Sequence, residues 1–232
     1  MYMKKEIINL NPLIYIIEDF LSEEECNHII NISKKKFKKA IVSSAGSGKN
    51  VESSSRTNNT TWLNHYTDNI TKKICANVSS LVDIPLYNAE PMQVLEYFPG
   101  TKFDQHCDSY PKNGTKKSKF CLSGGGQRVV TCLMYLNNVE EGGETEFTKI
   151  KKKITPKLGK IVIFYNCDLK NYDVIENSQH KANKVIKGVK YAVNLWFREE
   201  RIDIPHKYLT LKKYNFNLIL FYKNILKNII NT

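Results

Sequence analysis

Hydrophobic and polar positions follow a helical period in two segments near the start of the chain. Apolar residues recur every three or four positions from about 22 to 39, behind the capping-box pair Ser22 and Glu25. The same spacing returns from about 68 to 81. Each segment is predicted to form an amphipathic helix that buries one face.

After Pro91 the apolar pattern changes to that of β-strands. The runs are rich in β-branched and aromatic residues and are separated by Gly, Pro and Asn. Two helices followed by a series of antiparallel strands predict a mainly β fold, a sandwich or barrel with the helices packed on one side. The predicted strands are residues 92–98, 128–136, 145–150, 159–166 and 190–197.

Two stretches between the predicted elements are polar and rich in Gly and Ser. Residues 43–59 and 110–127 are therefore predicted to be loops. The tail after Pro205 mixes apolar residues with lysines, which predicts a helix that docks on the sheet. A helix that binds a membrane surface or a partner is the alternative interpretation of this tail.

The composition is that of a folded globular protein. The 232 residues are 41% hydrophobic and 25% charged, which is enough for one sizeable core. The apolar run at the start, MYMKKEIINLNPLIYIIEDF, is too short and too polar for a membrane span and has no small-residue cleavage site. We therefore expect a cytoplasmic protein without a membrane span.

The formal net charge of +12 raises the question of an acidic partner. The lysines are dispersed along the chain and do not form one basic block, and the chain is also rich in Asn and Ile. A nucleic-acid partner is therefore not expected.

The cysteines form no CxxC pair and no spacing typical of a structural zinc site. Because no export signal is read, free thiols are the expected state. The six cysteines are Cys26, Cys75, Cys107, Cys121, Cys132 and Cys167.

A candidate metal site lies in the segment YFPGTKFDQHCDSY, residues 97–110. In an extended chain, positions i and i+2 point to the same side, so His106 and Asp108 converge while Cys107 faces away. Two ligands need a third, and His180, just ahead of the last predicted strand, would complete a two-histidine, one-carboxylate set for a ferrous ion. The alternative is a polar pair on a strand surface. The remaining histidines are His28, His65 and His206.

Several motifs follow one another in a fixed order along the chain. They are Y-F-P-G-x-x-F-x-x-H-x-D, R-x-x-T-x-L-M-Y-L, G-G-E-T, P-x-x-G, and a His followed ten residues later by Lys and then by Trp. In this order they resemble the prolyl 4-hydroxylase family of Fe(II)- and 2-oxoglutarate-dependent dioxygenases. The similarity extends to about Arg198 and includes the SRTN segment at Arg56.

The resemblance implies a domain plan and a role for individual residues. Lys190 is the implied partner of the distal carboxylate of 2-oxoglutarate, with Tyr97 and Thr145 hydrogen-bonded to the same group. A fixed ammonium beside a hydroxyl suits this task, because charge-assisted hydrogen bonds orient a carboxylate. Trp196 aligns with a tryptophan near the cosubstrate, and Arg128 with an arginine that places the peptide. The implied iron ligands are His106, Asp108 and His180. The implied parts are a support region of helices and strands at 1–90, a double-stranded β-helix, or jelly-roll, catalytic core at 91–200, and a helical tail at 201–232.

The resemblance also implies cofactors and a substrate. The cofactors are Fe(II), 2-oxoglutarate and dioxygen as cosubstrates, and L-ascorbate as reductant. The substrate is proline in a Pro-rich or collagen-like peptide, in a groove that the loops 43–59 and 110–127 border and over which they become ordered. The family often has proline where this chain has Lys184 and Thr148, which leaves the loop shapes open. Hydroxylation of another peptidyl residue such as lysine, and an idle basic binding module of the same fold, are the alternatives. Lys190 favours the collagen-type prolyl branch, because other branches generally carry Arg there.

Overall fold

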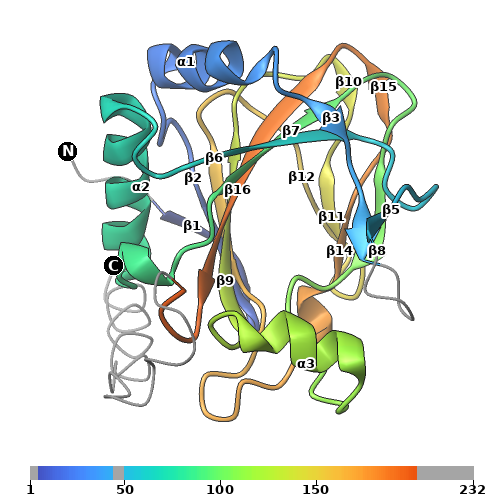
Figure 1. Cartoon of the computed structure of the whole chain (residues 1–232). Helices are drawn as coiled ribbons and strands as arrows, with labels where there is room; N and C mark the ends of the chain where they lie inside the picture. Colours follow the sequence, from blue (N-terminus) through green and yellow to red (C-terminus); the bar gives the residue numbers. More distant parts are fainter. Residues whose placement is uncertain (1–4, 44–49, 203–232) are drawn as a thin grey trace.

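The computed structural model describes residues 5–43 and 50–202 of the chain. Its centre consists of two facing β-sheets, with two helices against the outer side of the larger sheet (Figure 1). All the strand pairs in these sheets are antiparallel. The protein is mainly β with a jelly-roll core, which confirms the predicted fold class.

Strands from distant parts of the chain lie side by side in both sheets. In order across the larger sheet they are β1 (Lys5–Leu10), β2 (Leu13–Ile17), β13 (Ile161–Tyr165), β9 (Arg128–Tyr135), β16 (Lys190–Arg198), β7 (Met92–Tyr97), β6 (Asn59–Leu63) and β3 (Lys38–Lys39). The smaller sheet contains β12 (Lys152–Ile154), β11 (Thr145–Phe147), β14 (His180–Ala182) and β8 (Phe103–His106). Two further pairs are β10 (Glu141–Gly142) with β15 (Val185–Lys187), and β4 (Val42–Ser43) with β5 (Asn50–Val51).

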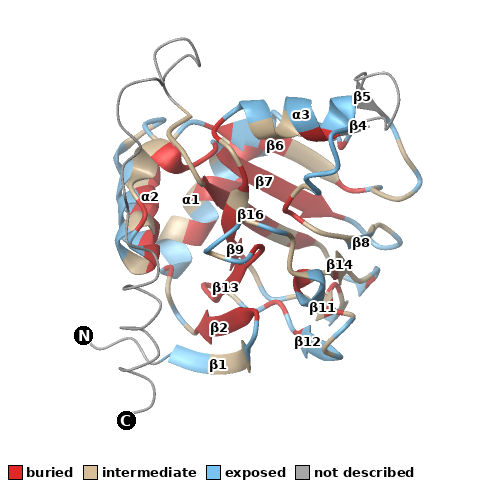
Figure 2. Ribbon diagram, turned by 90° about the horizontal axis from the view of Figure 1, so that it is seen from below, coloured by how far each residue is buried: buried red, intermediate tan, exposed pale blue. Residues whose placement is uncertain are grey.

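The larger sheet has a hydrophobic cluster on each face. The outer cluster joins the sheet to α1 (Glu23–Ser33) and α2 (Asn69–Val82), and Figure 2 shows the central strands buried while the outer sides of the helices are exposed. Burial of apolar surface on both faces is the main stabilising contribution. The inner cluster includes Ile14, Leu95, Tyr97, Leu133, Tyr135, Phe147 and Phe164.

Helix α1 begins as the sequence predicts but ends earlier. Ser22 accepts a hydrogen bond from the backbone of Glu25, and the Glu25 side chain accepts one from the backbone of Ser22. The predicted end at about 39 is wrong, since the helix ends at Ser33. Residues 34–36 are exposed lysines with no apolar face to bury, and the chain then joins the sheet edge as β3.

Helix α2 confirms its prediction to within one residue at each end. Asp68 caps the helix and accepts a hydrogen bond from the backbone of Thr71, whose hydroxyl in turn accepts one from the backbone of Asp68. The buried stripe contains Ile74, Cys75 and Val78, at the spacing of one helix face.

The five predicted strands are present as β7, β9, β11, β13 and β16, and their ends differ from the prediction by at most three residues. Several other strands were missed. All five residues of β2 are buried, so it shows no apolar and polar alternation, and β12, β14 and β15 have three residues each. A period cannot be read from such segments.

The prediction of a loop at 110–127 is wrong in part, because the segment contains α3 (Lys116–Ser123) together with short connections. Thr115 caps this helix by accepting a hydrogen bond from the backbone of Ser118. The side chain of Gln127 bonds to both the backbone N–H and the carbonyl of Tyr110, at 2.7 Å each, which joins the two ends of the segment.

The predicted loop at 43–59 contains β5 and a turn in which the Arg56 N–H donates to the carbonyl of Ser53, and its residues 44–49 lie outside the described residues. Additional short 3-10 turns occur at η1 (Leu86–Asn88) and η2 (Glu176–Ser178). The predicted C-terminal helix and His206 also lie outside the described residues. Within the part of the chain that the structure describes, no helix is long and apolar enough to cross a membrane.

Candidate metal and cosubstrate site

His106, Asp108 and His180 come together between the two sheets. His106 ends β8, His180 begins β14, and the two are direct partners in the strand register. Nε2 of His106 lies 3.6 Å from Oδ1 of Asp108, and Nε2 of His180 lies 3.8 Å from Oδ2. The three ligand atoms all lie within 4.8 Å of one another. The fold therefore brings together the three residues that the sequence singled out.

Backbone carbonyl groups orient both imidazole rings. Nδ1 of His106 lies 2.8 Å from the carbonyl oxygen of Asp104, and Nδ1 of His180 lies 2.9 Å from that of Ser178. A carbonyl only accepts, so Nδ1 carries the proton and Nε2 keeps its lone pair for a metal. The His106 ring also stacks on Phe103, with 3.7 Å between ring centroids.

The larger sheet holds the carboxylate of Asp108. The hydroxyl of Thr131 and the indole N–H of Trp196 both donate to Oδ2, at 2.7 and 2.9 Å. Asn166 donates to the Thr131 hydroxyl at 2.8 Å. The supporting roles of Thr131 and Asn166 were missed, although Thr131 is the threonine of the R-x-x-T motif and its position in β9 was a usable signal.

The protonation states suit a divalent cation. Burial disfavours the charged form of Asp108, but His180 and His106 hold the pKa of this carboxyl well below its usual range. Burial, with His106 nearby, lowers the pKa of His180 to about 4. Near neutral pH the site therefore presents a carboxylate beside the neutral imidazole of His180, as metal binding requires.

This donor set fits a ferrous ion. Two imidazoles and one carboxylate form the facial triad of non-haem Fe(II) oxygenases, which leaves positions open for other ligands. Cys107 is partly exposed and is not one of the three clustered residues, as strand alternation predicts. His28 contacts Asp68 and His65 contacts the carbonyl of Glu90, so neither belongs to the site.

A small cavity of about 30 Å³ lies beside the triad on the inner face of the larger sheet. It contains the residues that the resemblance assigns to 2-oxoglutarate. The lining residues are Leu95, Tyr97, Phe103, His106, Leu133, Thr145, His180, Lys181, Ala182, Lys190 and Asn194.

Lys190 is the buried cation of this cavity. It is 2% exposed, and its Nζ donates to the carbonyl of Gly143 at 2.6 Å. The rings of Tyr97 and Tyr135 lie 5.1 and 5.3 Å from Nζ. Burial lowers the pKa of Lys190 to about 7. A carboxylate placed beside it would stabilise the ammonium form.

Tyr135 is a further residue that the sequence reasoning missed, and it contacts the lining residues Thr145 and Lys190. Its hydroxyl donates to Oγ1 of Thr145 at 2.7 Å, which leaves the Thr145 hydrogen to donate elsewhere. Tyr135 follows Thr131 and Leu133 in alternation along β9, so the position of its side chain on the inner face was readable once β9 was predicted.

Arg128 lies in a buried charge cluster beside the triad. Its Nε and Nη2 donate to the two carboxylate oxygens of Glu90 at 2.6 and 2.7 Å, and Nε of Arg198 donates to the same carboxylate at 2.6 Å. Burial by itself would raise the pKa of Glu90, but the two arginines hold this pKa below its usual value. The Arg128 guanidinium also lies 3.9 Å over the ring of Trp196, the residue bonded to Asp108. Glu90 and Arg198 carry no local motif and were missed.

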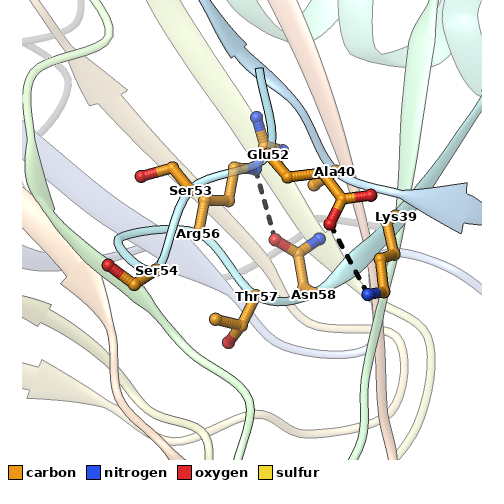
Figure 3. Close-up of a pocket in the computed structure, with 8 residues that line it drawn as sticks. All are labelled: Lys39, Ala40, Glu52, Ser53, Ser54, Arg56, Thr57 and Asn58. Atoms are coloured by element: carbon orange, nitrogen blue, oxygen red, sulfur yellow. Dashed lines mark hydrogen bonds and ion pairs between the residues drawn. The ribbon is translucent and has the colours of Figure 1, made fainter.

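A second pocket, of about 280 Å³, is lined by residues of the SRTN segment and its neighbours, which Figure 3 shows. Arg56 donates to Asn58 at 3.2 Å, a bond drawn as a dashed line in Figure 3, and to Gln93 at 3.0 Å. Its guanidinium lies 4.6 Å over the ring of Phe103, which stacks on His106. Arg56 of the SRTN segment is therefore separated from His106 of the triad by the ring of Phe103. The pocket is lined by Lys39, Ala40, Glu52, Ser53, Ser54, Arg56, Thr57 and Asn58.

Comparisons with known proteins agree with this geometry. A family model described as the 2OG-Fe(II) oxygenase superfamily matches residues 92–198. The protein named "Probable prolyl 4-hydroxylase 7" of Arabidopsis thaliana is 33% identical over 214 residues, which are 84% of this chain and 66% of that protein. Prolyl 4-hydroxylase 5 of the same plant is 30% identical over 218 residues, 86% of this chain and 72% of that protein.

A solved structure extends the comparison to three dimensions. The viral collagen prolyl hydroxylase of Paramecium Bursaria Chlorella virus-1, in a 2OG complex, is 28% identical to this chain, with a TM-score of 0.64. The match covers 80% of this chain and 95% of the viral one. The likeness therefore includes nearly the whole of that enzyme.

Proposed function

Because this chain belongs to the prolyl 4-hydroxylase family of 2OG-Fe(II) oxygenases, we propose that its substrate is proline in a Pro-rich or collagen-like peptide segment. The chain is a 2-oxoglutarate-dependent dioxygenase, so hydroxylation is coupled to decarboxylation of 2-oxoglutarate. The observation that carries the proposal is the convergence of His106, Asp108 and His180 beside a cavity that contains Lys190.

Different residues of the site have different proposed roles in this reaction. Fe(II) with 2-oxoglutarate supplies the oxidation: one atom of dioxygen enters a substrate C–H bond as hydroxyl, the other enters succinate, and carbon dioxide leaves. In our proposal the triad of His106, Asp108 and His180 holds the ion. Lys190 and the Thr145 hydroxyl bind the distal carboxylate of the cosubstrate.

Tyr97 and Trp196 complete the cosubstrate side of the site in this proposal. Burial raises the pKa of Tyr97 to about 12, so its phenol keeps its proton and can donate to the distal carboxylate. Trp196 fixes Asp108 through its indole N–H and closes that side of the site. Both side chains are almost completely buried, which helps to exclude water from the reacting atoms.

Arg128 is proposed to place the peptide. Its position against Trp196 and Glu90, next to the triad, supports a role at the substrate side of the site. Arg128→Ala should lower peptide hydroxylation more than the uncoupled conversion of 2-oxoglutarate to succinate. Equal loss of the two reactions would assign Arg128 to support of Asp108 through Trp196 instead.

The iron assignment has a direct spectroscopic test. Under anaerobic conditions, Fe(II) and 2-oxoglutarate together should give a weak visible charge-transfer band with the parent protein. The band should be absent in His180→Ala, because a required ligand is missing. A metal-loaded, folded parent protein without the band would contradict the assignment.

The substrate is tested by turnover against a panel of peptides, scored by mass spectrometry. The panel contains Pro-rich, collagen-like and lysine-containing peptides. We expect a gain of one oxygen on proline. Oxygen only on lysine would replace the prolyl assignment and leave the dioxygenase class intact. An idle binding module is not favoured, because the complete triad and Lys190 are all in place.

L-ascorbate is proposed as the reductant that keeps the iron ferrous when decarboxylation occurs without peptide. Omitting it should shorten the active lifetime of the enzyme. Addition of another one-electron reductant should restore the lifetime. No effect of ascorbate on the decay of activity would contradict this part of the proposal.

A reducing compartment such as the cytoplasm is also proposed. All six cysteines are unpaired, and burial raises the pKa of Cys26, Cys75 and Cys167. Thiols are the form expected where disulfides are kept reduced. Alkylation after rapid acid quenching of producing cells should label every cysteine, and a disulfide found in this way would contradict the proposal.

A further inference from the structure

A row of aromatic rings and a guanidinium group runs along one rim of the triad. The indole of Trp62 lies 6.2 Å from that of Trp196. The Arg128 guanidinium lies 3.9 Å over the Trp196 ring and 5.4 Å from the ring of Tyr110. The row passes the metal site at Trp196, whose N–H is bonded to Asp108. It connects β6, β16, β9 and the segment after β8.

Trp62 is the exposed end of this row. It is 48% exposed, whereas Trp196 is 4% exposed. In the strand register Trp62 lies opposite Gln93, whose side chain accepts a hydrogen bond from Arg56 beside the triad. Trp62 therefore shares the face of the sheet that carries the site. A large apolar ring left open to solvent at this position is available to a bound molecule.

A Pro-rich segment in the polyproline II conformation fits such a row. Prolines have no backbone N–H and present their rings, and aromatic-lined surfaces recognise them. The helix has three residues per turn and rises about 3.1 Å per residue, so residues three positions apart lie about 9 Å apart on one side. Trp62 is separated from Asp108 by one indole ring, because its centroid lies 6.2 Å from that of Trp196 and the Trp196 N–H is bonded to Asp108, so its distance from the triad is on the scale of one such turn.

We propose that Trp62 binds the peptide residue three positions away from the hydroxylated proline, and that proline is the residue preferred there. The inference rests on the proposed function, because it takes a Pro-rich peptide as the ligand. Trp62 then acts as a specificity residue outside the metal and cosubstrate sites. It selects segments in which prolines recur once per turn of the polyproline II helix.

Fluorescence tests the contact without turnover. The chain has two tryptophans, Trp62 and Trp196. When decaproline is added to the full chain without iron, emission should shift to shorter wavelengths as Trp62 becomes covered. Trp62→Phe keeps an aromatic ring but leaves only the buried Trp196, so the shift should be lost. A shift of equal size in Trp62→Phe would overturn the inference.

Kinetics test whether Trp62 contacts the peptide residue three positions from the hydroxylated proline. In the peptide, the proline three positions from the target, on one side or the other, is replaced by Ala. The kcat/KM of the parent should then fall about three- to tenfold, the range expected for loss of one ring contact. Trp62→Ala should be insensitive to this replacement. The matched control is Phe98→Ala, which removes a 42% exposed ring just beyond the opposite end of β7 and should keep the parent's sensitivity.

The outcomes separate this inference from the proposed function. If the parent hydroxylates proline peptides and Trp62→Ala remains as sensitive as the parent to the replaced proline, the inference fails and the proposed function stands. If the parent hydroxylates no proline peptide, the proposed function fails, and the emission shift with decaproline still decides whether Trp62 binds such segments. Thermal melts of both tryptophan variants confirm that each is folded during the measurements.

Discussion

Lys190 lies in the cavity beneath the rings of Tyr97 and Tyr135, where burial lowers its pKa to about 7. The neutral amine is therefore accessible near neutral pH in the free enzyme. A dicarboxylate binds the ammonium form, so binding raises the pKa and takes up a proton at higher pH. Binding of 2-oxoglutarate beside Lys190 is therefore expected to depend on pH.

The affinity for 2-oxoglutarate should weaken above about pH 7. Calorimetry between pH 7 and 8.5 should show the Kd rising by up to about tenfold per pH unit, because the neutral amine must regain a proton. Lys190→Arg stays charged over this range and should remove the dependence. A parent Kd that does not change with pH would contradict the role of Lys190.

Removal of the Lys190 ammonium group should weaken the binding of 2-oxoglutarate but not of Fe(II). Lys190→Ala should weaken 2-oxoglutarate binding about tenfold to a hundredfold at pH 7, the value of one charge-assisted hydrogen bond, while Fe(II) binding stays nearly unchanged. Titration of each ligand measures the two effects. Equal cosubstrate affinity in variant and parent would show that the lysine does not contact the distal carboxylate.

The hydroxyl of Thr131 supports the carboxylate of Asp108. It donates to Asp108 and accepts from Asn166, so Thr131→Val removes one of the two hydrogen bonds that hold the carboxylate and leaves only that of Trp196. Loss of such a supporting bond weakens metal affinity about tenfold to a hundredfold. An anaerobic Fe(II) titration measures this. The control Thr61→Val changes a buried threonine of β6 that lies opposite Val94 on the helix-covered face, and it should bind Fe(II) as the parent does.

At the scale of elements, α3 depends on contacts from the larger sheet. Nη1 of Arg198 donates to the carbonyl oxygens of Cys121 and Gly126, both at 2.8 Å, near the end of the helix. Carbonyls at a helix C-terminus lack partners within the helix, so a guanidinium stabilises them. The same arginine bonds to Glu90, which connects α3 to the charge cluster beside the triad.

Arg198→Ala should release α3 without unfolding the domain. Limited proteolysis should cut within residues 110–127 several times faster than in the parent, and a bound Pro-rich peptide should slow the cleavage. Arg201→Ala is the control, because it removes a guanidinium that lies over Tyr87 instead. Cleavage at the parent's rate in Arg198→Ala would show that other contacts hold the helix.

At the scale of the whole molecule, the metal site connects the two sheets. The histidines belong to the smaller sheet, while Thr131 and Trp196 of the larger sheet hold the Asp108 carboxylate. An ion that binds the folded state alone stabilises it by mass action. Fe(II) binding should therefore raise the stability of the entire jelly roll and not of the site alone.

This stabilisation can be measured by anaerobic thermal melting. Fe(II) at 100 times its Kd should add about 2.7 kcal/mol to the free energy of unfolding and raise the Tm. His180→Ala should show almost no shift with the same Fe(II), because one of three ligands is lost. An equal shift in the variant would place the stabilising ion somewhere other than the triad.

The sequence was sufficient wherever a local rule applied. The ends of α2, the start of α1 and the five predicted strands followed from caps, periodicity and residue type, which depend on neighbouring residues alone. The spacing of His106 and Asp108 indicated a shared direction, and the ordered motifs added His180 and Lys190. The short strands β12, β14 and β15 and the helix α3 were missed, because pairing and capping contacts from distant residues stabilise them.

By itself the sequence determined which residues are proposed to carry the chemistry, since side-chain type and order are local properties of the chain. Only the tertiary structure decided what supports them. Tyr135 and Glu90 occupy ordinary strand and loop positions, and their roles arise because the fold places them within hydrogen-bonding distance of Thr145 and Arg128. Such contacts join residues on different strands or loops, and their geometry is fixed by packing of both sheets, which no periodicity along one segment contains.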